Sequence, residues 1–503
     1  MSDEDTYGGE LRKVKLGKLE KIKKLGIDPY PTKYDRTHYT VDIVEQFETL
    51  EKEQAAVAVA GRCTAIRKMG KAIFGHLRDF KGKIQIYVRK DKISEQQYEL
   101  IGLIDIGDFL GVKGRIFRTK TGEITVAAED IQLLAKTLLP LPIVKEEEID
   151  GKTVTHDAFA DKELRYRRRY LDLAVNPEVK EIFITRAKIV SSMRRYLENK
   201  GYIEVETPVL QPVYGGASAR PFKTHHNVLD TDLYLRIADE LYLKRLIAGG
   251  FEGVFEIAKD FRNEGIDRLH NPEFTMMELY VAYKNHEFMM EIAEDMIAAI
   301  AQEVTGSMKI TYQGQKIDLT PPWERLKMTE AIKRYTGYNV DGAGLALLKK
   351  YADELEIETE PFWGPGKIIE EIFDEFVEKK ITHPTFIIDY PSETSPLAKK
   401  NPSNPDIVER FEAIAAGFEL ANGYSELNDP QDQKQRFLDQ MAKRRLGDEE
   451  AQVLDEDYIM ALEYGMPPTT GIGVGIDRLS ILLTDTNSLK DVILFPQMKP
   501  QDD

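Results

Sequence analysis

Short strands separated by glycines, between residues 57 and 135, restrict the fold of this chain more than any other sequence feature. Five runs alternate or are rich in β-forming side chains: 57–63, 73–78, 83–89, 110–117 and 124–127. Glycines punctuate these runs, and a polar stretch at 94–101 between the third and fourth is predicted to be helical. The pattern predicts a small, independently folded β-domain.

Five short strands with a helix between the third and fourth are typical of the OB-fold, a β-barrel that often binds single-stranded nucleic acid. Phe74, Gln85 and Tyr87 would then offer stacking and hydrogen-bonding groups on its face. On this pattern alone, a small β-domain with ordinary surface aromatics remains the alternative.

The charge balance limits how this chain can contact nucleic acid. Among 503 residues, Lys and Arg number 69 and Asp and Glu number 86, so 69 − 86 gives a net charge of −17. Proteins that coat nucleic acid are usually basic, so any such contact here must be local. Two basic patches stand out, an amphipathic helix at 11–25 and the run 165–170. The apolar face of the predicted helix at 11–25 is expected to hold Leu11, Val14, Leu19, Ile22 and Leu25. Taken alone, each patch reads more readily as a solvated charged face.

The single cysteine, Cys63, excludes an internal disulfide and a clustered-thiolate metal site. The acidic N-terminus does not resemble a signal peptide, and no apolar run reaches the roughly 18 residues of a membrane helix. We therefore expect a cytoplasmic protein with no membrane association.

Four regions are predicted along the chain: a basic helix and lead-in at 1–50, the OB-fold at 51–140, a linker at 141–176 and a large α+β domain at 177–503. The large domain is predicted to contain helices at 180–200, 239–248, 287–304 and 366–379.

Two runs in the large domain predict a hairpin that carries a functional face. Period-two alternation in 254–264 and 274–280 places Arg262 and Glu264 on the same sheet surface as Phe274 and Glu278. His270 lies in the connecting loop. A charged face with interleaved aromatic residues favours a binding site over a merely solvated surface.

Two further segments suggest a phosphate and metal site. Glu412 and Glu419 would lie on opposite faces of one regular strand, so they can meet only if the chain turns or bulges, and Ala416–Gly417 is a plausible place. Paired carboxylates beside phosphate oxygens suit Mg²⁺. The run 471–478 combines a glycine-rich strand with Arg478 at the start of a helix, where a phosphate can bind, although a packed glycine-rich strand explains it equally well.

Together these segments resemble the three signature motifs of class II aminoacyl-tRNA synthetases: 201–208, 261–274 and 473–478. Five longer runs are similar to lysyl-tRNA synthetases of the bacterial type, subclass IIb: 215–217, 219–227, 235–245, 270–280 and 422–428. The resemblance covers residues 57–500. It implies an α+β protein, with an N-terminal OB-fold β-barrel for the anticodon and a catalytic domain built on an antiparallel six-stranded sheet flanked by helices.

The resemblance also implies site residues. The ATP site would comprise Arg262, Glu264, His270, Asn271, Phe274 and Arg478, of which Arg262 and Arg478 are catalytic. The lysine site would comprise Gly216, Glu240, Glu278, Tyr280, Asn422 and Glu426. Mg²⁺ would bind Glu412 and Glu419, and the anticodon would be read by Arg67, Phe74, Gln85 and Glu123.

The implied activity is that of a lysine–tRNA ligase acting in translation. L-Lysine and ATP form lysyl-adenylate and pyrophosphate, and lysine then passes to the terminal ribose hydroxyl of tRNA(Lys). The partners are tRNA(Lys), L-lysine, ATP and a second copy of the chain, because motif 1 builds a homodimer in this family. Independently of the family, a pocket supplied with Glu240, Glu278 and Glu426 favours a substrate with two ammonium groups.

Three alternatives stay open. A synthetase paralogue would pass lysine to another acceptor, although such relatives typically lack the OB-fold. An aspartyl or asparaginyl enzyme is disfavoured by the acidic pocket, and a non-catalytic scaffold by the presence of every expected catalytic residue. One departure from some bacterial relatives is Leu269, where they carry an arginine before the histidine.

Overall fold

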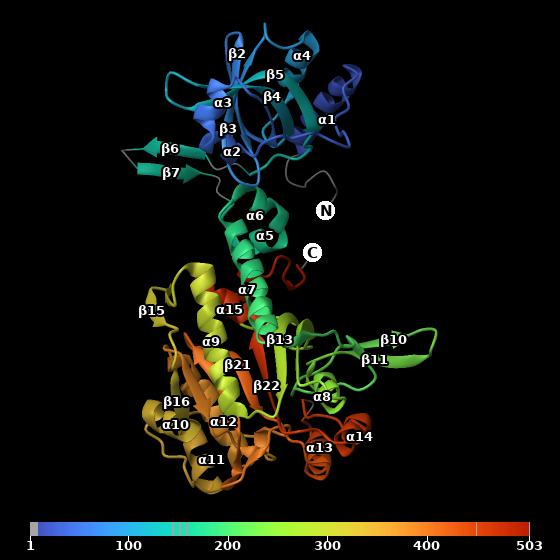
Figure 1. Ribbon diagram of the computed structural model, residues 1–503, viewed down its shortest axis with the longest axis vertical. Helices are drawn as coiled ribbons and strands as arrows, with labels where there is room; N and C mark the ends of the chain where they lie inside the picture. The colour runs from blue at the N-terminus through green and yellow to red at the C-terminus, as the bar shows by residue number, and fades with distance from the viewer. Residues whose placement is uncertain (1–8, 143–144, 150–151, 157–158, 449, 502–503) are drawn as a thin grey trace. The chain divides into compact units, whose positions relative to one another are not determined.

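The computed structural model describes residues 9–142, 145–149, 152–156, 159–448 and 450–501 (Figure 1). The chain divides into two compact units, Met1–Ala160 and Asp161–Asp503. The boundary falls within the range 141–176 that the sequence suggests as a linker, and the second half of that range is helical and belongs to the second unit. No helix in the described part of the chain is long and apolar enough to cross a membrane.

The first unit is a closed five-stranded barrel, as the sequence predicts. Its elements are α1 (Gly9–Lys24), α2 (Thr40–Glu45), α3 (Phe47–Lys52), β1 (Ala56–Met69), β2 (Ala72–Arg78), β3 (Lys83–Arg89), α4 (Glu95–Leu103), β4 (Phe109–Arg118), β5 (Ile124–Ala135), β6 (Lys145–Ile149) and β7 (Lys152–His156). The barrel order is β1-β2-β3-β5-β4, and β3 pairs with β5 in parallel. Helix α4 lies between β3 and β4, which is the predicted OB-fold arrangement.

Strict alternation of burial closes this barrel around an aliphatic core. Strands β2 and β3 bury every second side chain, and Ile73, Ile86 and Val126 meet inside. Cys63 lies in the same core with 1% of its surface exposed, and burial raises the pKa of its thiol to about 12. The other residues of each strand face outward, and they form the surface to which Phe74 and Gln85 belong.

Helix α1 forms as predicted, but its apolar face is shorter than expected. Leu19 and Ile22 are buried, whereas Leu11 and Val14 are each more than half exposed. Lys18 pairs with Asp105 (2.5 Å), so part of the basic charge of this helix is used inside the first unit. The sequence pattern overestimated the length of the apolar face, because three-residue and four-residue spacings of apolar residues do not by themselves show which of these residues are buried.

The second unit begins with helices that carry the other basic patch. They are α5 (Lys162–Arg167), α6 (Arg169–Val175) and α7 (Val179–Asn199). Arg169 is buried, donates to Asp172 (2.7 Å) and donates to the carbonyl of Leu494 (3.1 Å), while Arg165 also pairs with Asp172 (2.8 Å). These arginines therefore help to fix the end of the chain against α6.

One large sheet organises the rest of the second unit. Its strands, in spatial order, are β16 (Glu324–Lys327), β17 (Thr385–Ile388), β20 (Arg410–Ala415), β21 (Phe418–Ser425), β22 (Thr469–Gly475), β13 (Glu273–Ala282), β12 (Gly253–Phe261) and β8 (Ile203–Glu204). The six strands from β17 to β12 are antiparallel, as expected, but β16 and β8 add a parallel strand at each edge. The sheet is thus eight-stranded and mixed.

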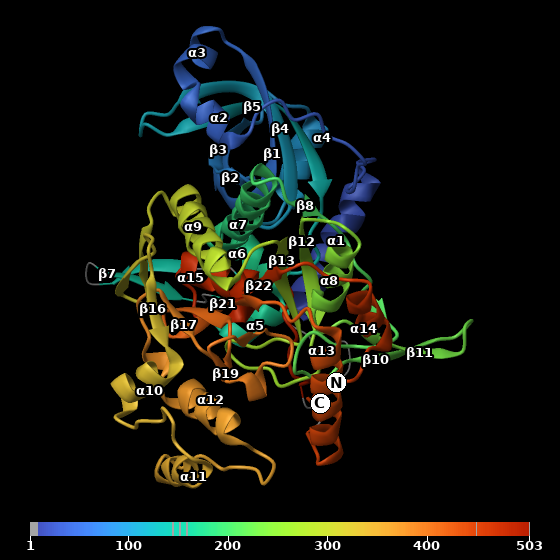
Figure 2. The same cartoon turned by 60° about the horizontal axis from the view of Figure 1, so that its bottom comes forward.

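Helices cover one face of this sheet and leave the other for the site. Helices α7, α9 (His286–Thr305) and α15 (Ile476–Leu483) lie side by side against it (Figures 1 and 2). Their apolar stripes, with Met193 and Met296 among them, pack on Phe255, Ile472 and other inward strand residues.

The remaining elements surround the other face and the sheet edges, or pack with the helices of the covered face. They are β9 (Leu210–Gln211), β10 (Lys223–His226), β11 (Thr231–Leu235), α8 (Glu240–Ala248), β14 (Lys309–Tyr312), β15 (Gln315–Asp318), α10 (Met328–Thr336), α11 (Leu345–Glu354), α12 (Pro365–Phe376), η1 (Glu378–Lys380), η2 (Ser392–Thr394), β18 (Lys400–Asn401), β19 (Asn404–Val408), α13 (Pro430–Arg445), α14 (Glu456–Glu463) and α16 (Leu489–Val492). The elements that pack with those helices include β14, β15 and α16.

Candidate active site

A cavity of about 850 Å³ opens on the uncovered face of the large sheet. Every residue of the second unit that the sequence proposes for a site lines this cavity: Gly216, Glu240, Arg262, Glu264, His270, Asn271, Phe274, Glu278, Tyr280, Glu412, Glu419, Asn422, Glu426 and Arg478. Strands β12, β13, β20, β21 and β22 lie next to one another, which is why residues more than 200 positions apart share one wall.

The predicted hairpin, β12 and β13, supplies the first wall. Its register pairs Asp260 with Phe274 and Glu256 with Glu278. Arg262 follows the end of β12, where its Nε donates to the carbonyl of Ile237 (3.3 Å) and its guanidinium stands 4.9 Å from the Phe274 ring centroid. A flat aromatic face beside a guanidinium can hold a planar base next to an anion.

The second wall joins the hairpin loop to helix α15. Arg478 Nη1 donates to Glu419 Oε2 (2.8 Å), and its Nη2 lies 3.5 Å from His270 Nε2. His270 Nδ1 is in turn 2.8 Å from Asp267. Leu269, the unusual residue of this loop, is partly buried against the hydrophobic core under the sheet and also lines the cavity, while His270 is exposed to the cavity.

Glu412 and Glu419 meet because the chain turns between them. Ala416 and Gly417 both have positive φ (57° and 80°) and close the β20–β21 hairpin at the predicted place. Glu412 pairs with Asn422 on one side of a register shift that follows Ala413, and Ile414 pairs with Glu419 on the other side. The shift places the two glutamates on the same face of the sheet. Burial and the charge of Glu419 raise the pKa of Glu412 to about 7.

Arg410 holds this acidic wall in place. Its guanidinium donates to Glu412 (2.6 Å), to the side-chain amide oxygen Oδ1 of Asn422 (3.2 Å) and to Ser395 (2.9 Å). Neighbouring carboxylates raise the pKa of Arg410 although burial lowers it. Arg410 therefore orients two proposed site residues at once.

Two glycines leave space for functional side chains. At Gly216 φ is +92°, and a Cβ would approach the Cβ atoms of Ala238 (3.0 Å) and Glu240 (3.1 Å). At Gly471 on β22, a Cβ would lie 2.4 Å from atoms of both Glu426 and Tyr280. The bare strand that the sequence shows therefore makes room for pocket side chains as well as for a ligand.

The deepest part of the cavity is acidic. Glu278 accepts from the Tyr280 hydroxyl (3.0 Å), and Tyr424 donates to Glu240 (2.7 Å). Glu426 is 1% exposed and pairs with the ammonium group of Lys244, which also pairs with Glu240. Burial raises the pKa of Glu278 to about 8, with Asp260 and Glu240 adding to the effect.

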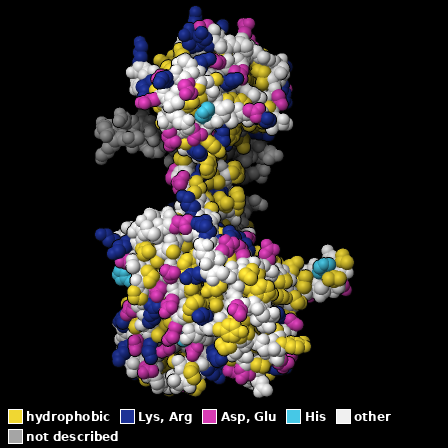
Figure 3. Space-filling view, in the orientation of Figure 1, with side chains coloured by type: hydrophobic (Ala, Val, Ile, Leu, Met, Phe, Trp, Pro, Cys, Tyr) yellow, Lys and Arg dark blue, Asp and Glu magenta, His cyan; other side chains and the backbone are white. Residues whose placement is uncertain are grey.

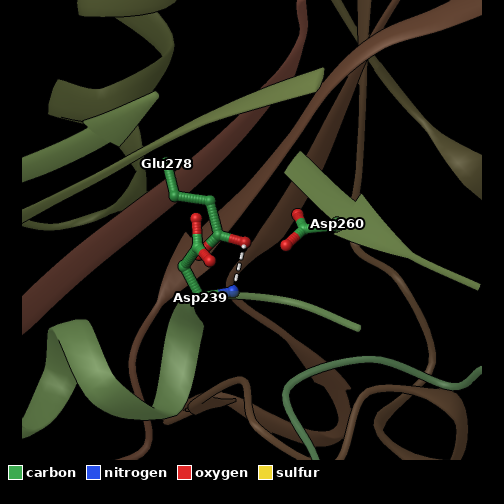
Figure 4. A group of neighbouring side chains, drawn as sticks. All are labelled: Asp239, Asp260 and Glu278. Carbon is green, nitrogen blue, oxygen red and sulfur yellow. Dashed lines mark hydrogen bonds between the residues drawn. The ribbon is translucent and has the colours of Figure 1, made fainter. Parts of the chain in front are cut away.

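Behind this wall lies a second acidic group, formed by Asp239, Asp260 and Glu278 (Figure 4). The three carboxylates face one another, and Glu278 accepts from the backbone N–H of Asp239 (3.3 Å). Arg236 supplies the cation, because it lies 3.0 Å from Asp239 and 3.4 Å from Asp260. Burial raises the pKa of Asp239 to about 10, with Asp260 and Glu278 adding to the effect, so this group favours a proton in addition to the guanidinium of Arg236.

The first unit brings its proposed residues to one outer face. Phe74 stacks near Tyr87, with ring centroids 4.8 Å apart, and Arg67 is the cross-strand partner of Phe74. Gln85 donates to Glu123 (2.6 Å), which also pairs with His76 (2.8 Å). Aromatic rings beside hydrogen-bonding groups can stack on and read unpaired bases.

The two units match two known families. A family model for tRNA synthetases class II (D, K and N) matches residues 161–499, and one for an OB-fold nucleic acid binding domain matches residues 57–134. The chain belongs to the class II tRNA synthetases.

Relatives of this class II synthetase are similar over almost their whole length. Lysine–tRNA ligases of three bacteria illustrate this. The protein from Carboxydothermus hydrogenoformans is 53% identical (98% of this chain, 99% of the relative). Those from Moorella thermoacetica and Syntrophomonas wolfei are 52% identical (98% and 99%) and 49% identical (100% and 99%).

Sequence reasoning missed the cations that organise the synthetase site. Lys244, Arg236 and Arg410 were not singled out, because each acts on carboxylates rather than lining a recognisable motif. The spacing of Glu240 and Lys244, four apart on a predicted helix, was an available signal for Lys244. His76 could have been found from its alternation with Phe74 on one strand face.

The raised pKa of Glu278 generates a stability prediction. The folded protein favours the protonated carboxyl, so stability is greatest below the ordinary pKa of 4.5 and falls as the pH rises toward about 8. We expect Glu278→Gln to remove this loss, which amounts to at most about 5 kcal/mol at about 1.4 kcal/mol per pKa unit. Urea denaturation of the ligand-free protein at pH 5, 6.5 and 8 measures it.

The matched control is Glu375→Gln, which changes an exposed glutamate on α12. Its unfolding free energy should follow the wild type at each pH. If Glu278→Gln also runs parallel to the wild type, Glu278 titrates near its ordinary value and the acidic pocket is better hydrated than its burial indicates.

Proposed function

We propose that the chain is a lysine–tRNA ligase. It would activate L-lysine with ATP, giving lysyl-adenylate and pyrophosphate, and then transfer lysine to the terminal ribose hydroxyl of tRNA(Lys). The observation that carries the proposal is the acidic end of the cavity, where Glu240, Glu278 and Glu426 lie together beside Tyr280. Relatives about 50% identical over nearly the full chain carry this name, which supports it.

The acidic pocket supports lysine over other amino acids. Buried carboxylates are stabilised by an ammonium group and destabilised without one, so a substrate with two ammonium groups gains most. Glu240 with Gly216 would hold the α-ammonium group, and Glu426 with Tyr280 the ε-ammonium group. Aspartate would add a negative charge and asparagine would leave a carboxylate unpaired, which disfavours the aspartyl and asparaginyl alternatives.

The opposite end of the cavity suits ATP. Phe274 would stack on adenine and Glu264 with Asn271 would contact the base, while His270 and Arg478 would meet the outer phosphates. In the first step a lysine carboxylate oxygen attacks the α-phosphorus, and pyrophosphate leaves. Arg262 would bind both the carboxylate and the α-phosphate, because phosphoryl transfer depends mainly on positioning and charge neutralisation.

Glu412 and Glu419 fit a divalent cation. Their carboxylates share one face, repel each other enough to raise the pKa of Glu412, and offer the oxygen ligands that Mg²⁺ prefers. Arg410 and Arg478 already balance part of their charge, which suits a cation that arrives with ATP phosphates. Bound there, Mg²⁺ would neutralise phosphate charge as pyrophosphate departs.

The OB-fold supports tRNA as the acceptor. Paralogues that transfer lysine elsewhere typically lack this domain, whereas here it is complete and offers Phe74, Arg67, Gln85 and Glu123 to an anticodon. The contact is local, as the net charge of −17 requires. An enzyme that charges tRNA for translation would work in the cytoplasm.

Lysine-dependent exchange of pyrophosphate into ATP tests the first step. We expect exchange with lysine and none with aspartate, asparagine or no amino acid. Arg262→Ala should lower the exchange rate by about 100-fold or more, because a charge that stabilises the transition state is lost. Arg334→Ala, which removes an exposed arginine of α10, is the matched control and should exchange normally.

Wild-type exchange in Arg262→Ala would contradict the assigned site. Absence of exchange with every amino acid, in folded protein, would favour a scaffold that has lost its activity.

The anticodon face generates a separate prediction. Phe74→Ala should weaken tRNA(Lys) binding by about 1–3 kcal/mol, since a stacking platform is lost, and leave lysine-dependent exchange unchanged. Filter binding and exchange assays measure the two effects. Phe80→Ala, at an exposed aromatic between β2 and β3, is the control. Equal tRNA affinity of Phe74→Ala and wild type would remove Phe74 from the interface.

Exposed apolar residues support the proposed homodimer. Ile203, Val209 and Leu210, after α7, are each at least 40% exposed, and Val228 and Leu229 project between β10 and β11. Figure 3 shows hydrophobic side chains gathered where this hairpin leaves the second unit. A patch of this kind is typical of a protein–protein interface.

We expect Leu210→Arg to sediment as a monomer where the wild type sediments as a dimer, because the introduced charges would be buried without partners. Leu347→Arg on α11 is the control, since Leu347 has a comparable exposure of 40% outside this patch. A monomeric wild type, or a dimeric Leu210→Arg variant, would place the interface elsewhere or exclude it.

A further inference from the structure

Lys244 is a buried cation beside the pocket that the proposed chemistry does not use. It lies on α8, one turn after Glu240, and its side chain is fully buried. Its ammonium group pairs with Glu240 and Glu426, the two carboxylates proposed to receive the substrate. Lys244 itself does not line the cavity, so it stands one layer behind them.

The surroundings of Lys244 come from three further elements. Tyr424 of β21 and Tyr458 of α14 present their rings, with centroids 5.5 Å and 6.0 Å from the ammonium nitrogen. Burial and the neighbouring carboxylates, Glu278 among them, raise the pKa of Tyr280 on β13, and Glu278 also raises the pKa of Glu426. Arg245, the next residue of α8, pairs instead with Asp455 and Asp457. Lys244 therefore sits in an enclosed cage whose charged walls are the pocket glutamates.

We propose that Lys244 is a positioning and specificity-determining residue, which holds the carboxylates of Glu240 and Glu426 in the orientation that receives the two ammonium groups of the substrate. The proposal deepens the function above and rests on lysine being the substrate.

Charge balance gives the reason. Glu240 and Glu426 share one resident ammonium group, so the three groups together carry one net negative charge when both carboxylates are ionised, and Glu278 adds a second when it ionises. Two negative charges match the two ammonium groups of lysine, while its carboxylate would be held by Arg262. A buried carboxylate without a cation takes up a proton, and a neutral carboxyl group no longer distinguishes an ammonium group from an amide.

Titration behaviour agrees with this reading. Burial raises the pKa of Glu426, and Glu240 and Glu278 raise it further, whereas Lys244 is the neighbour that lowers it. Glu240 and Glu426 in turn raise the pKa of Lys244 above its ordinary value despite complete burial. The Lys244 ammonium group is thus charged before substrate arrives, and it favours the ionised form of Glu426.

Lysine-dependent pyrophosphate exchange with Lys244→Ala tests the proposal. We expect KM for lysine to rise by about 10- to 100-fold, as expected for losing a hydrogen bond to a charged group, while KM for ATP changes less than about twofold. KM for lysine should also become more steeply dependent on pH between 6 and 8, because Glu426 loses the neighbour that lowers its pKa and must release a proton when lysine binds.

Chemical rescue separates charge from packing. Propylammonium should fit the space left by Lys244→Ala and lower KM for lysine toward the wild-type value, whereas propanol, of similar size and neutral, should not. Arg245→Ala removes a charge from the neighbouring position, outside the pocket, and is expected to keep the wild-type KM for lysine.

Three results would overturn the proposal: an unchanged KM for lysine in Lys244→Ala, equal rescue by propylammonium and propanol, or an unaltered pH dependence. Failure of both Lys244→Ala and Lys244→Met to fold would also overturn it, making Lys244 a folding residue. The wild-type enzyme distinguishes failure of the Lys244 proposal from failure of the proposed function. If the wild type shows no lysine-dependent exchange, the proposed function itself is rejected.

Discussion

A carboxylate inside a protein needs a cation or a proton beside it, and the catalytic unit is arranged around that requirement. Six of the acidic residues in or behind the cavity have a resident cation: Arg236 for Asp239 and Asp260, Lys244 for Glu240 and Glu426, Arg410 for Glu412, and Arg478 for Glu419. These partners come from different elements and hold the walls of the cavity together. They do not cancel the acidic charge fully, so the site stays ready for the cations that a lysine–tRNA ligase would bind.

The sheet can hold these acidic groups and their partners in place because local features of the chain, a turn and a register shift, fix its register. The β20–β21 hairpin closes at Ala416–Gly417, and the register shift after Ala413 returns Glu419 to the face of Glu412. The opposite face is packed by α7, α9 and α15, so a slip of one residue would expose core side chains. The same apolar burial that stabilises the sheet therefore also keeps the acidic groups aligned.

The sequence predicts the barrel, the β12–β13 hairpin and the principal helices because their hydrophobic periods are local. The sequence also predicts that Glu412 and Glu419 can come together only if the chain turns or bulges between them. It does not predict the parallel edge strands β8 and β16, which hold two and four residues and pair through distant contacts. Nor does it predict the partners of Arg236 and Arg410, because an ion pair between separate elements leaves no periodic trace in the chain.

Cys63 gives the barrel a property of experimental use. It is the single thiol of the chain, it lies in the barrel core, and the raised pKa of the thiol keeps it in its unreactive protonated form. A thiol reagent can modify it only after the barrel opens. The rate of labelling would therefore follow the opening of the first unit alone, without an introduced probe, and would distinguish loosening of that unit from events in the catalytic unit.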